Sequence, residues 1–291
     1  MYKAIAANKR NTVIIMIVFF VLIGGLAWFV SYYYGDWDIA IYAVSIAAIY
    51  ALIQYFAAGR LAMTVNGAHE ISKKDNPTLW NTVENIAITE GLPMPRVFLI
   101  DDPAPNAFAT GRNPKSAMVA ATTGLIDIMD KRELAAVMAH EMGHVRNYDI
   151  LVSMIVFGLV SAISLVSDII LRMTFFGRGS SDNKSPYVLI IGIIAVVIAP
   201  IVALLVQLAV SRQREYLADA SSAMTTRDPD GMIMALEKLK ANGRPMRRQN
   251  TSTAHLFLNN PLKKGFFNKI FSTHPPLDER IARLKKHEAR F

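Results

Sequence analysis

Two histidines flank a glutamate in the stretch His140-Glu141-Met142-Gly143-His144. The surrounding residues favour a helix with an apolar face. On a helix, side chains four residues apart lie one turn above each other, so His140 and His144 can hold one metal ion from the same face. Glu141 lies beside them, where a carboxylate can take a proton from a water molecule. The pattern is typical of a zinc hydrolase.

The alternative is an ordinary helix that carries two histidines by chance. The chain contains only 6 histidines, and two of them fall at this spacing on an otherwise apolar helix. Burying two imidazoles and a carboxylate without partners would be costly. We therefore favour the metal site, which requires a third ligand elsewhere. Because the chain has no cysteine, that ligand must be a histidine, an aspartate or a glutamate.

The composition indicates a membrane protein. Hydrophobic residues make up 53% of the 291 residues and charged residues 19%, which is more apolar than a typical soluble domain. The net charge of +8 is compatible with nucleic acid, but basic residues of membrane proteins usually mark the cytoplasmic flanks and contact anionic lipid. We therefore expect the lipid bilayer as a partner and no nucleic acid.

Four apolar runs divide the chain. The first two, Thr12 to Tyr34 and Ile39 to Ala58, carry no charge and are long enough to cross a bilayer. The first is too long for a signal peptide and leads directly into the second, so we expect a transmembrane hairpin. Aromatic residues typical of a membrane interface surround its turn, at Trp28, Tyr32, Tyr33, Tyr34 and Trp37.

The third and fourth runs are Ile150 to Leu171 and Tyr187 to Val210. Parts of the expected active site come before and after this pair of runs in the sequence, and they must lie on the same side of the membrane. The chain therefore crosses the membrane here twice or not at all. The alternative to two crossings is a buried helical hairpin. We favour two crossings, with Asp168 at the membrane interface.

The part between the hairpins has the pattern of a small mixed domain. Pro77 to Glu90 should form a helix that begins at a proline, and Arg96 to Ile100 a short buried strand. Two more strands are expected at Asn106 to Thr110 and Ala117 to Thr122, joined as a hairpin. Two further helices are expected near the C-terminus, at Pro229 to Asn242 and Leu277 to Ala289.

A second group of charged residues follows the fourth run directly. On a helix, Glu215 and Asp219 share a face. The alternative is an ordinary charged turn at a membrane boundary, in which Arg212 and Arg214 face lipid and Glu215 neutralises them. The residues alone leave both interpretations open.

The whole chain resembles the HtpX family, membrane-bound zinc metalloproteases of bacteria and archaea that are related to the CAAX prenyl endopeptidases. The resemblance rests on the four apolar runs, the His140 to His144 motif, Asn106-Ala107-Phe108-Ala109, Glu215 to Asp219, and Ser272-Thr273-His274-Pro275-Pro276 with Arg280. It implies a gluzincin-type site with one Zn²⁺ per chain. The implied zinc ligands are His140, His144 and Glu215.

The same resemblance implies roles for residues around the zinc. Glu141 is the implied general base. Asp219 is implied to orient a histidine ligand, because a metal-bound imidazole usually donates its other N–H to an acceptor. His274 and Arg280 are implied to lie near the site, where they stabilise the oxyanion or order a loop. For His274 the alternative is a surface histidine on a rigid turn. The other histidines, His69, His255 and His287, are expected to be ordinary surface or locally hydrogen-bonded residues.

The expected fold class is a mainly α membrane protein with four transmembrane helices and a zincin-like α+β catalytic domain that contains a small β-sheet. Residues 1–58 form the first transmembrane hairpin and residues 150–210 the second. Residues 59–149 and 211–291 form the two parts of the catalytic domain, the first with the histidine helix and the second with the third ligand.

Substrate binding is expected at Asn106, Ala107, Phe108 and Ala109. A protease that acts on many unfolded sequences needs affinity from the backbone groups that every peptide carries, and adding the substrate as a strand to a sheet edge provides it. In similar gluzincins an Asn-Ala-Phe segment forms this edge. The alternative is that Ala107 and Phe108 pack in an interior strand.

The chemistry follows from the ligand set. Three protein ligands leave one position for water, as in catalytic zinc sites. Zinc lowers the pKa of water and polarises the scissile carbonyl, while Glu141 takes the proton and passes it to the leaving amine. No serine or cysteine nucleophile is needed.

The expected function is a zinc-dependent endopeptidase that cleaves misfolded or damaged membrane proteins and other unfolded polypeptides. The quality-control role is implied by the resemblance. The resemblance also implies a multi-pass protein of a prokaryotic cell membrane. The distribution of lysine and arginine places its active site on the cytoplasmic side. The alternatives are a prenyl-peptide or other specific processing protease and a non-catalytic metal-bound membrane scaffold. The sequence leaves the oligomeric state open.

Overall fold

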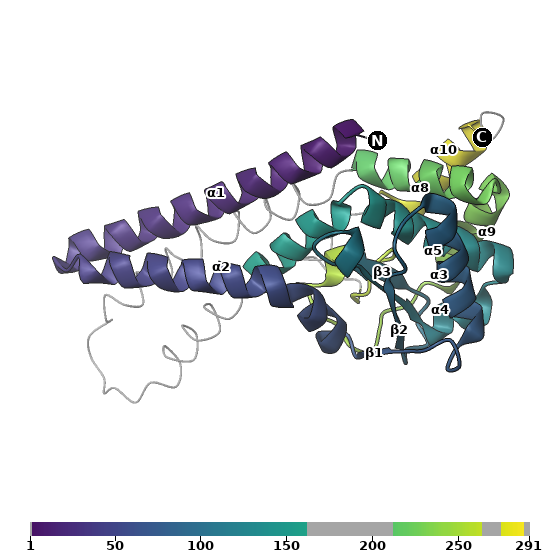
Figure 1. Ribbon diagram of the computed structural model, residues 1–291, viewed down its shortest axis with the longest axis horizontal. Coiled ribbons are helices and arrows are strands. Elements are labelled where there is room, and N and C mark those ends of the chain that lie inside the picture. Colours follow the sequence, from purple (N-terminus) through teal and green to yellow (C-terminus); the bar gives the residue numbers. More distant parts are fainter. Residues whose placement is uncertain (1, 162–211, 264–274, 288–291) are drawn as a thin grey trace.

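Two long apolar helices form the N-terminal part of the fold. Helix α1 (Tyr2–Tyr34) and helix α2 (Asp38–Val65) lie side by side and project from the rest of the protein (Figure 1). They are joined at Gly35, whose φ of 69° is a conformation that glycine adopts without strain. The structure is a computed structural model and describes residues 2–161, 212–263 and 275–287.

Both helices contain a segment long and apolar enough to cross a membrane, Ile5–Gly25 in α1 and Ala40–Val65 in α2. Large apolar side chains of α2 are exposed, among them Ile46, Leu52 and Phe56, as expected for a helix in contact with lipid. Of the third expected span, the structure describes the apolar helix Asp149–Ser161. The remainder of that run, with Asp168, and the fourth run lie outside the described residues, so two of the four expected spans are found.

A four-stranded mixed sheet forms the centre of the part of the fold that follows α2. Its strands are β1 (Ala68–Glu70), β2 (Arg96–Ile100), β3 (Ala107–Thr110) and β4 (Met118–Thr122), in the order β1-β2-β4-β3. Strands β2 and β4 are parallel, and the two outer pairs are antiparallel. The expected β3–β4 hairpin is confirmed, and β3 lies at an edge rather than in the interior. Strand β1 is too short for a recognisable alternation and was not predicted.

Alternate residues of the strands face two different apolar clusters. Val97, Val119 and Ala121 belong to a cluster that includes the helices over one face of the sheet. Phe98 and Phe108 belong to a second cluster on the other face, with residues of α1, α2 and the helix Asp149–Ser161. Because both faces are covered, strands β2, β3 and β4 are almost continuously apolar.

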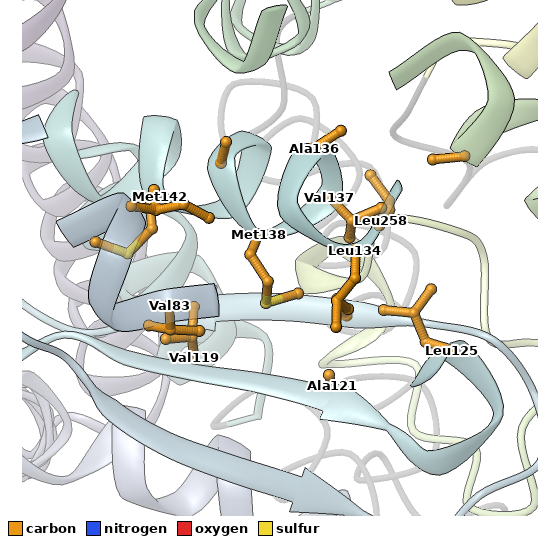
Figure 2. Close-up of a cluster of buried hydrophobic side chains, with 14 of the residues drawn as sticks. Val83, Val119, Ala121, Leu125, Leu134, Ala136, Val137, Met138, Met142 and Leu258 are labelled. Carbon is orange, nitrogen blue, oxygen red and sulfur yellow. The ribbon is translucent and has the colours of Figure 1, made fainter. Parts of the chain in front are cut away.

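The helix that carries the histidines lies over the first face. Helices α3 (Pro77–Glu90), α4 (Thr123–Ile128) and α5 (Lys131–Arg146) precede the second apolar hairpin. Asp130 and Glu133 form a capping box at the start of α5, which satisfies otherwise unpaired backbone donors. Leu134, Met138 and Met142 recur one turn apart and pack among the core residues over the sheet (Figure 2). This packing fixes which face of α5 turns away from the sheet.

The C-terminal helices complete the part of the fold that surrounds the sheet. They are α8 (Arg212–Thr226), α9 (Pro229–Asn242) and α10 (Leu277–His287), with a short 3₁₀ turn at Ala254–Leu256. Helix α8 crosses α5 closely at small residues: a Cβ added to Gly143 would lie 3.7 Å from the Cα of Ala218. The Ser222 hydroxyl donates to the Ala136 carbonyl at 2.6 Å. The close crossing brings the charged residues of α8 against the histidines of α5.

Candidate metal centre

The two histidines of α5 meet a glutamate of α8. The Nε2 atoms of His140 and His144 lie 3.2 Å apart. The carboxylate oxygens of Glu215 lie 3.7 Å from His140 Nε2 and 3.5 Å from His144 Nε2. One nitrogen or oxygen atom from each residue thus converges on a common point, and these atoms all lie within 4.8 Å of one another.

These distances fit a metal ion. Ligand bonds of about 2.0–2.2 Å at tetrahedral angles place the ligand atoms of zinc about 3.3–3.6 Å apart. Each histidine also has a carboxylate beside its Nδ1 atom, His140 that of Asp219 and His144 that of Asp149. When Nδ1–H donates to a carboxylate, Nε2 carries the lone pair. Two lone pairs that face each other repel, and a cation between them removes the repulsion.

His140 is held by a buried ion pair. Its Nδ1 atom lies 3.0 Å from Asp219 Oδ1. Arg280 of α10 donates to both oxygens of that carboxylate, from Nε to Oδ2 at 2.9 Å and from a terminal nitrogen to Oδ1 at 2.6 Å. Burial alone would raise the pKa of Asp219, but the charge of Arg280 and the bond to His140 lower the pKa to about 2. Asp219 is therefore an anion that fixes the imidazole.

The surrounding carboxylates favour positive charge at the two imidazoles. Burial lowers the pKa of His140, but hydrogen bonds to Asp219 and Glu215 outweigh burial and raise the pKa to about 9. Burial also opposes protonation of His144, yet the charge of Glu215 and the bond to Asp149 raise its pKa. A metal cation satisfies the same anionic surroundings in place of the protons.

Asp149 supports the second histidine, a role that no sequence pattern predicted. Its Oδ2 atom lies 2.9 Å from His144 Nδ1. Asp149 follows Tyr148, whose φ of 62° is rare outside glycine. This turn directs the carboxylate back towards the end of α5. No sequence pattern indicated this contact, which depends on the turn at Tyr148.

Glu141 lines a cleft beside the candidate ligands. The lining also includes Ala109, His144, Glu215 and His255, so strand β3, helices α5 and α8, and the turn Ala254–Leu256 all contribute to one cleft. His255 was expected to be an ordinary surface or locally hydrogen-bonded histidine. Instead it is buried, and its Nε2 donates at 3.0 Å to the carbonyl of Ser153, which is 102 residues away in the sequence. Its place on the cleft wall was not predicted.

Arg214 is part of this region rather than a lipid-facing anchor. Its side chain is only 13% exposed, and one terminal nitrogen lies 3.7 Å from Asp149 Oδ1. The interpretation of Arg212 to Asp219 as an ordinary charged turn at the membrane therefore does not hold for Arg214. The neighbouring Glu215 points to the histidines.

The four substrate-binding candidates lie in different surroundings. The Asn106 amide donates to the Asn259 carbonyl at 2.7 Å, and Phe108 is fully buried against Phe257. Leu258 N–H donates to the Ala107 carbonyl at 2.9 Å. These contacts favour structural roles for the first three candidates, Asn106, Ala107 and Phe108. Ala109 lines the cleft.

The two remaining candidates differ in what the structure describes. His274 lies outside the described residues. Arg280 lies near the ligands as expected, with a terminal nitrogen 3.4 Å from His140 Nδ1 and another 4.0 Å from Glu215 Oε2. It does not appear among the residues that line the cleft with Glu141. Its contacts are those of a group that orients the ligands.

The chain is similar to known proteins over most of its length. Residues 73–288 match Peptidase family M48. The chain is 55% identical over 286 residues to a protease HtpX homolog of Tropheryma whipplei (strain Twist), covering 98% of both chains. It is 47% identical over 298 residues to a protease HtpX homolog of Streptococcus pneumoniae (strain Hungary19A-6), covering 98% of this chain and 99% of that one. A crystal structure of S. mikatae Ste24p aligns with a TM-score of 0.48 at 18% identity, covering 98% of this chain and 67% of that one.

The family match and the protease homologues show that the chain is a metallopeptidase, and the His-His-Glu cluster could hold its metal ion. Within that class, the chain belongs to Peptidase family M48. The resemblance to the HtpX family that the motifs indicated is confirmed.

Proposed function

We propose that the chain is a zinc-dependent endopeptidase of a prokaryotic cell membrane that cleaves misfolded or damaged membrane proteins. The observation that carries the proposal is the convergence of His140, His144 and Glu215 beside Glu141 in one cleft. The high identity to HtpX homologues over nearly the whole chain supports it. A metal-bound scaffold without activity is the alternative, but it gives no role to Glu141.

Zinc suits the donor set. Two imidazoles and one carboxylate, without thiolates, are the ligands of many catalytic zinc sites. Bound there, zinc supplies a Lewis acid for the scissile carbonyl and lowers the pKa of water. Asp219 and Asp149 fix the two imidazoles, and Arg280 keeps Asp219 charged.

Glu141 is the proposed general base. It is 2% exposed and lines the cleft next to His144 and Glu215. From this place it takes a proton from the attacking water and delivers it to the nitrogen of the leaving amine. Since water attacks the carbonyl carbon directly, no covalent intermediate with the protein forms.

The proposed substrate is an extended polypeptide bound to the edge of the sheet at Ala109. Strand β3 is an edge strand, and it reaches the cleft that contains Glu141. Pairing with the backbone of the substrate gives affinity without a sequence requirement. This suits a protease that removes unfolded or damaged proteins.

The membrane arrangement is proposed from the sequence pattern. The chain would cross the membrane four times, and its two catalytic parts would then lie on one side. Most lysine and arginine residues outside the apolar runs belong to those parts and to the N-terminal end, which places this side in the cytoplasm. Helices α1 and α2 supply the first two spans by length and composition.

Proteolysis with and without metal tests the proposal. The purified full-length protein in detergent should cleave casein, lose activity with a zinc chelator and regain it with added zinc. Glu141→Gln should keep about one zinc per chain and lose proteolysis, because an amide cannot accept the proton. Glu237→Gln is the matched control, since Glu237 pairs with Lys285 on the surface. Full activity in Glu141→Gln would overturn the mechanism.

A further inference from the structure

An asparagine of the first helix reaches the region of the metal ligands. Asn8 lies near the N-terminal end of α1 and is 3% exposed. Its side-chain amide donates to Asp149 Oδ1 at 2.6 Å and to the Asn147 carbonyl at 2.8 Å. Figure 1 shows this end of α1 beside the start of α8. A helix assigned to the membrane therefore contributes a side chain to the catalytic part.

The two oxygens of Asp149 have different partners. Oδ1 accepts the hydrogen bond from Asn8, and Oδ2 lies 2.9 Å from His144 Nδ1. A carboxylate bonded at one oxygen cannot rotate freely about its last bond. The Asn8 amide therefore holds the other oxygen on the imidazole. At the same time, Asn8 binds the Asn147 carbonyl just after the end of α5.

The orientation of the Asn8 amide is itself determined. A terminal nitrogen of Arg214 donates to Asn8 Oδ1 at 3.4 Å. In the opposite orientation the oxygen of Asn8 would face two acceptors, the Asp149 carboxylate and the Asn147 carbonyl, and its NH₂ group would face a guanidinium. Only the observed orientation matches donors with acceptors. Three separate segments thus meet here: α1, the turn after α5, and α8.

The contact is specific rather than a general packing effect. Asn8, Asp149 and Arg214 are all largely buried, with Asp149 5% exposed and the Arg214 side chain 13% exposed. Buried polar side chains need partners, and here each supplies the partner of another. Removing the Asn8 amide leaves Asp149 Oδ1 without this donor.

We propose that Asn8 is a positioning residue of the metal centre, whose amide fixes the Asp149 carboxylate on His144 and so increases the affinity for the metal ion. The inference rests on the proposed zinc site. It makes the N-terminal end of α1 part of that site, although α1 supplies no ligand. Loss of partners that orient a metal-bound histidine typically weakens metal binding about 10–100-fold.

The experiment measures zinc affinity by competition with a chromophoric chelator in four full-length proteins: wild type, Asn8→Leu, Asp149→Asn and the double variant. Leucine is close to asparagine in size and donates no hydrogen bond. We expect Asn8→Leu to weaken zinc binding about 10-fold. Because Asn8 acts through Asp149, the double variant should bind zinc no more weakly than Asp149→Asn alone.

Two controls separate positioning from packing. Asn11→Leu makes the same change on the same helix, at a half-buried position, and should leave the affinity unchanged. Asn8→Leu combined with Asp219→Ala should weaken binding by the product of the single effects, because Asp219 supports the other histidine. If Asn8→Leu does not fold, Asn8→Asp replaces it, since aspartate keeps the shape and places a like charge against Asp149.

Three outcomes would overturn the inference. The first is unchanged zinc affinity in Asn8→Leu or in its substitute Asn8→Asp, and the second is a double variant whose zinc affinity falls by the product of the Asn8 and Asp149 effects. The third is a wild type that binds no zinc. The last would overturn the proposed function as well. A wild type that binds zinc but cleaves nothing contradicts only the proposed function. The role of Asn8 is then decided by the same four affinities.

Discussion

Arg280 and Asp219 form a two-point ion pair inside the protein, with distances of 2.9 and 2.6 Å. Arg280 is 0% exposed and Asp219 is 2% exposed. The same carboxylate lies 3.0 Å from His140 Nδ1. The arginine therefore compensates the charge of an anion that orients a candidate ligand, which differs from the oxyanion role considered from the sequence.

Replacing Arg280 by methionine should destabilise the fold strongly. The change leaves the Asp219 carboxylate buried without its counterion, and breaking a buried pair in this way typically costs about 3–5 kcal/mol. Chemical denaturation of the zinc-free protein measures the loss. The control is Lys286→Met, at an exposed position of the same helix, which should change stability by no more than about 0.5 kcal/mol. Wild-type stability in Arg280→Met would refute the pairing.

Alanine variants of Glu215 and Asp219 should distinguish a metal ligand from a residue that only orients a ligand. Glu215→Ala removes a metal-binding atom and should lose both zinc and activity. Asp219→Ala should retain zinc at about 10–100-fold lower affinity, because only the orientation of His140 is lost. Metal analysis and competition with a chelator measure both. Wild-type affinity in the two variants alike would show that neither residue serves the metal.

Local patterns predicted the elements that carry the ligands. The apolar spacing around His140 and His144 predicts a helix, and the structure has α5 at Lys131–Arg146. The proline and glycine boundaries predicted α3 and α9 at the residues where they occur. The four-residue spacing of Glu215 and Asp219 also places them on one face of a helix. These predictions succeed because each depends on neighbours within one or two turns.

The supporting residues could not be predicted in the same way. Asp149 reaches His144 only because Tyr148 adopts a positive φ, which no local pattern indicates for a tyrosine. Asn8 lies 141 residues from Asp149, and its role depends on how α1 packs against the catalytic part. In the sequence, Arg214 could be a membrane anchor. Its burial depends on the same packing and could not be predicted. Contacts of this range are set by the assembled fold.

The stability contributed by Asp228 should depend on pH. Asp228 accepts from Gly231 N–H at the start of α9 and pairs with Arg132 at 2.7 Å. Arg132 lowers the pKa of Asp228 below its ordinary value of 3.8, and the Gly231 bond adds to this. A lowered pKa means that the contribution is present above the unfolded-state pKa and is lost as the pH falls through the folded-state pKa.

Asp228→Ala should therefore lower the free energy of unfolding by about 1 kcal/mol at pH 7, the usual cost of losing a helix cap. The difference from wild type should shrink when the pH is lowered below about 4. Denaturant titrations at both pH values measure it. Asp127→Ala, at an exposed aspartate, is the control at pH 7 and should have little effect. If the difference in free energy of unfolding grows as the pH is lowered, the predicted direction of the pH dependence is wrong.

Reporter fusions should reveal the membrane topology. Reporters placed after residues 60, 178 and 291 should give cytoplasmic, external and cytoplasmic signals, because basic residues favour the cytoplasmic side. A reporter after Asp36, in the short turn between α1 and α2, should read external. A cytoplasmic signal at residue 178 would mean that the second apolar hairpin does not cross, although the two catalytic parts would still share a side.

The edge of β3 offers a substrate one backbone position, Ala109. Thr122 N–H donates to the Asn106 carbonyl, so in this antiparallel pair the backbone groups of Ala107 and Ala109 point away from β4. At Ala107 the chain itself uses these groups: its N–H donates to Asn106 Oδ1 at 3.1 Å, and its carbonyl accepts from Leu258. Ala109 lies next along the same edge and lines the cleft.

Proline at Ala109 should therefore impair substrate binding and leave the fold intact. It removes the outward N–H, and an edge strand tolerates its ring. The loss of one hydrogen bond of about 1–1.5 kcal/mol predicts a kcat/KM roughly 10-fold lower in folded, zinc-loaded protein. Ala107→Pro is the matched control: it removes an N–H that the chain already uses, so it should lower stability while the folded fraction keeps its kcat/KM. If Ala109→Pro retains full kcat/KM, the substrate does not pair with this edge. If instead it unfolds and loses zinc, the strand serves only the fold, and substrate must be held elsewhere in the cleft.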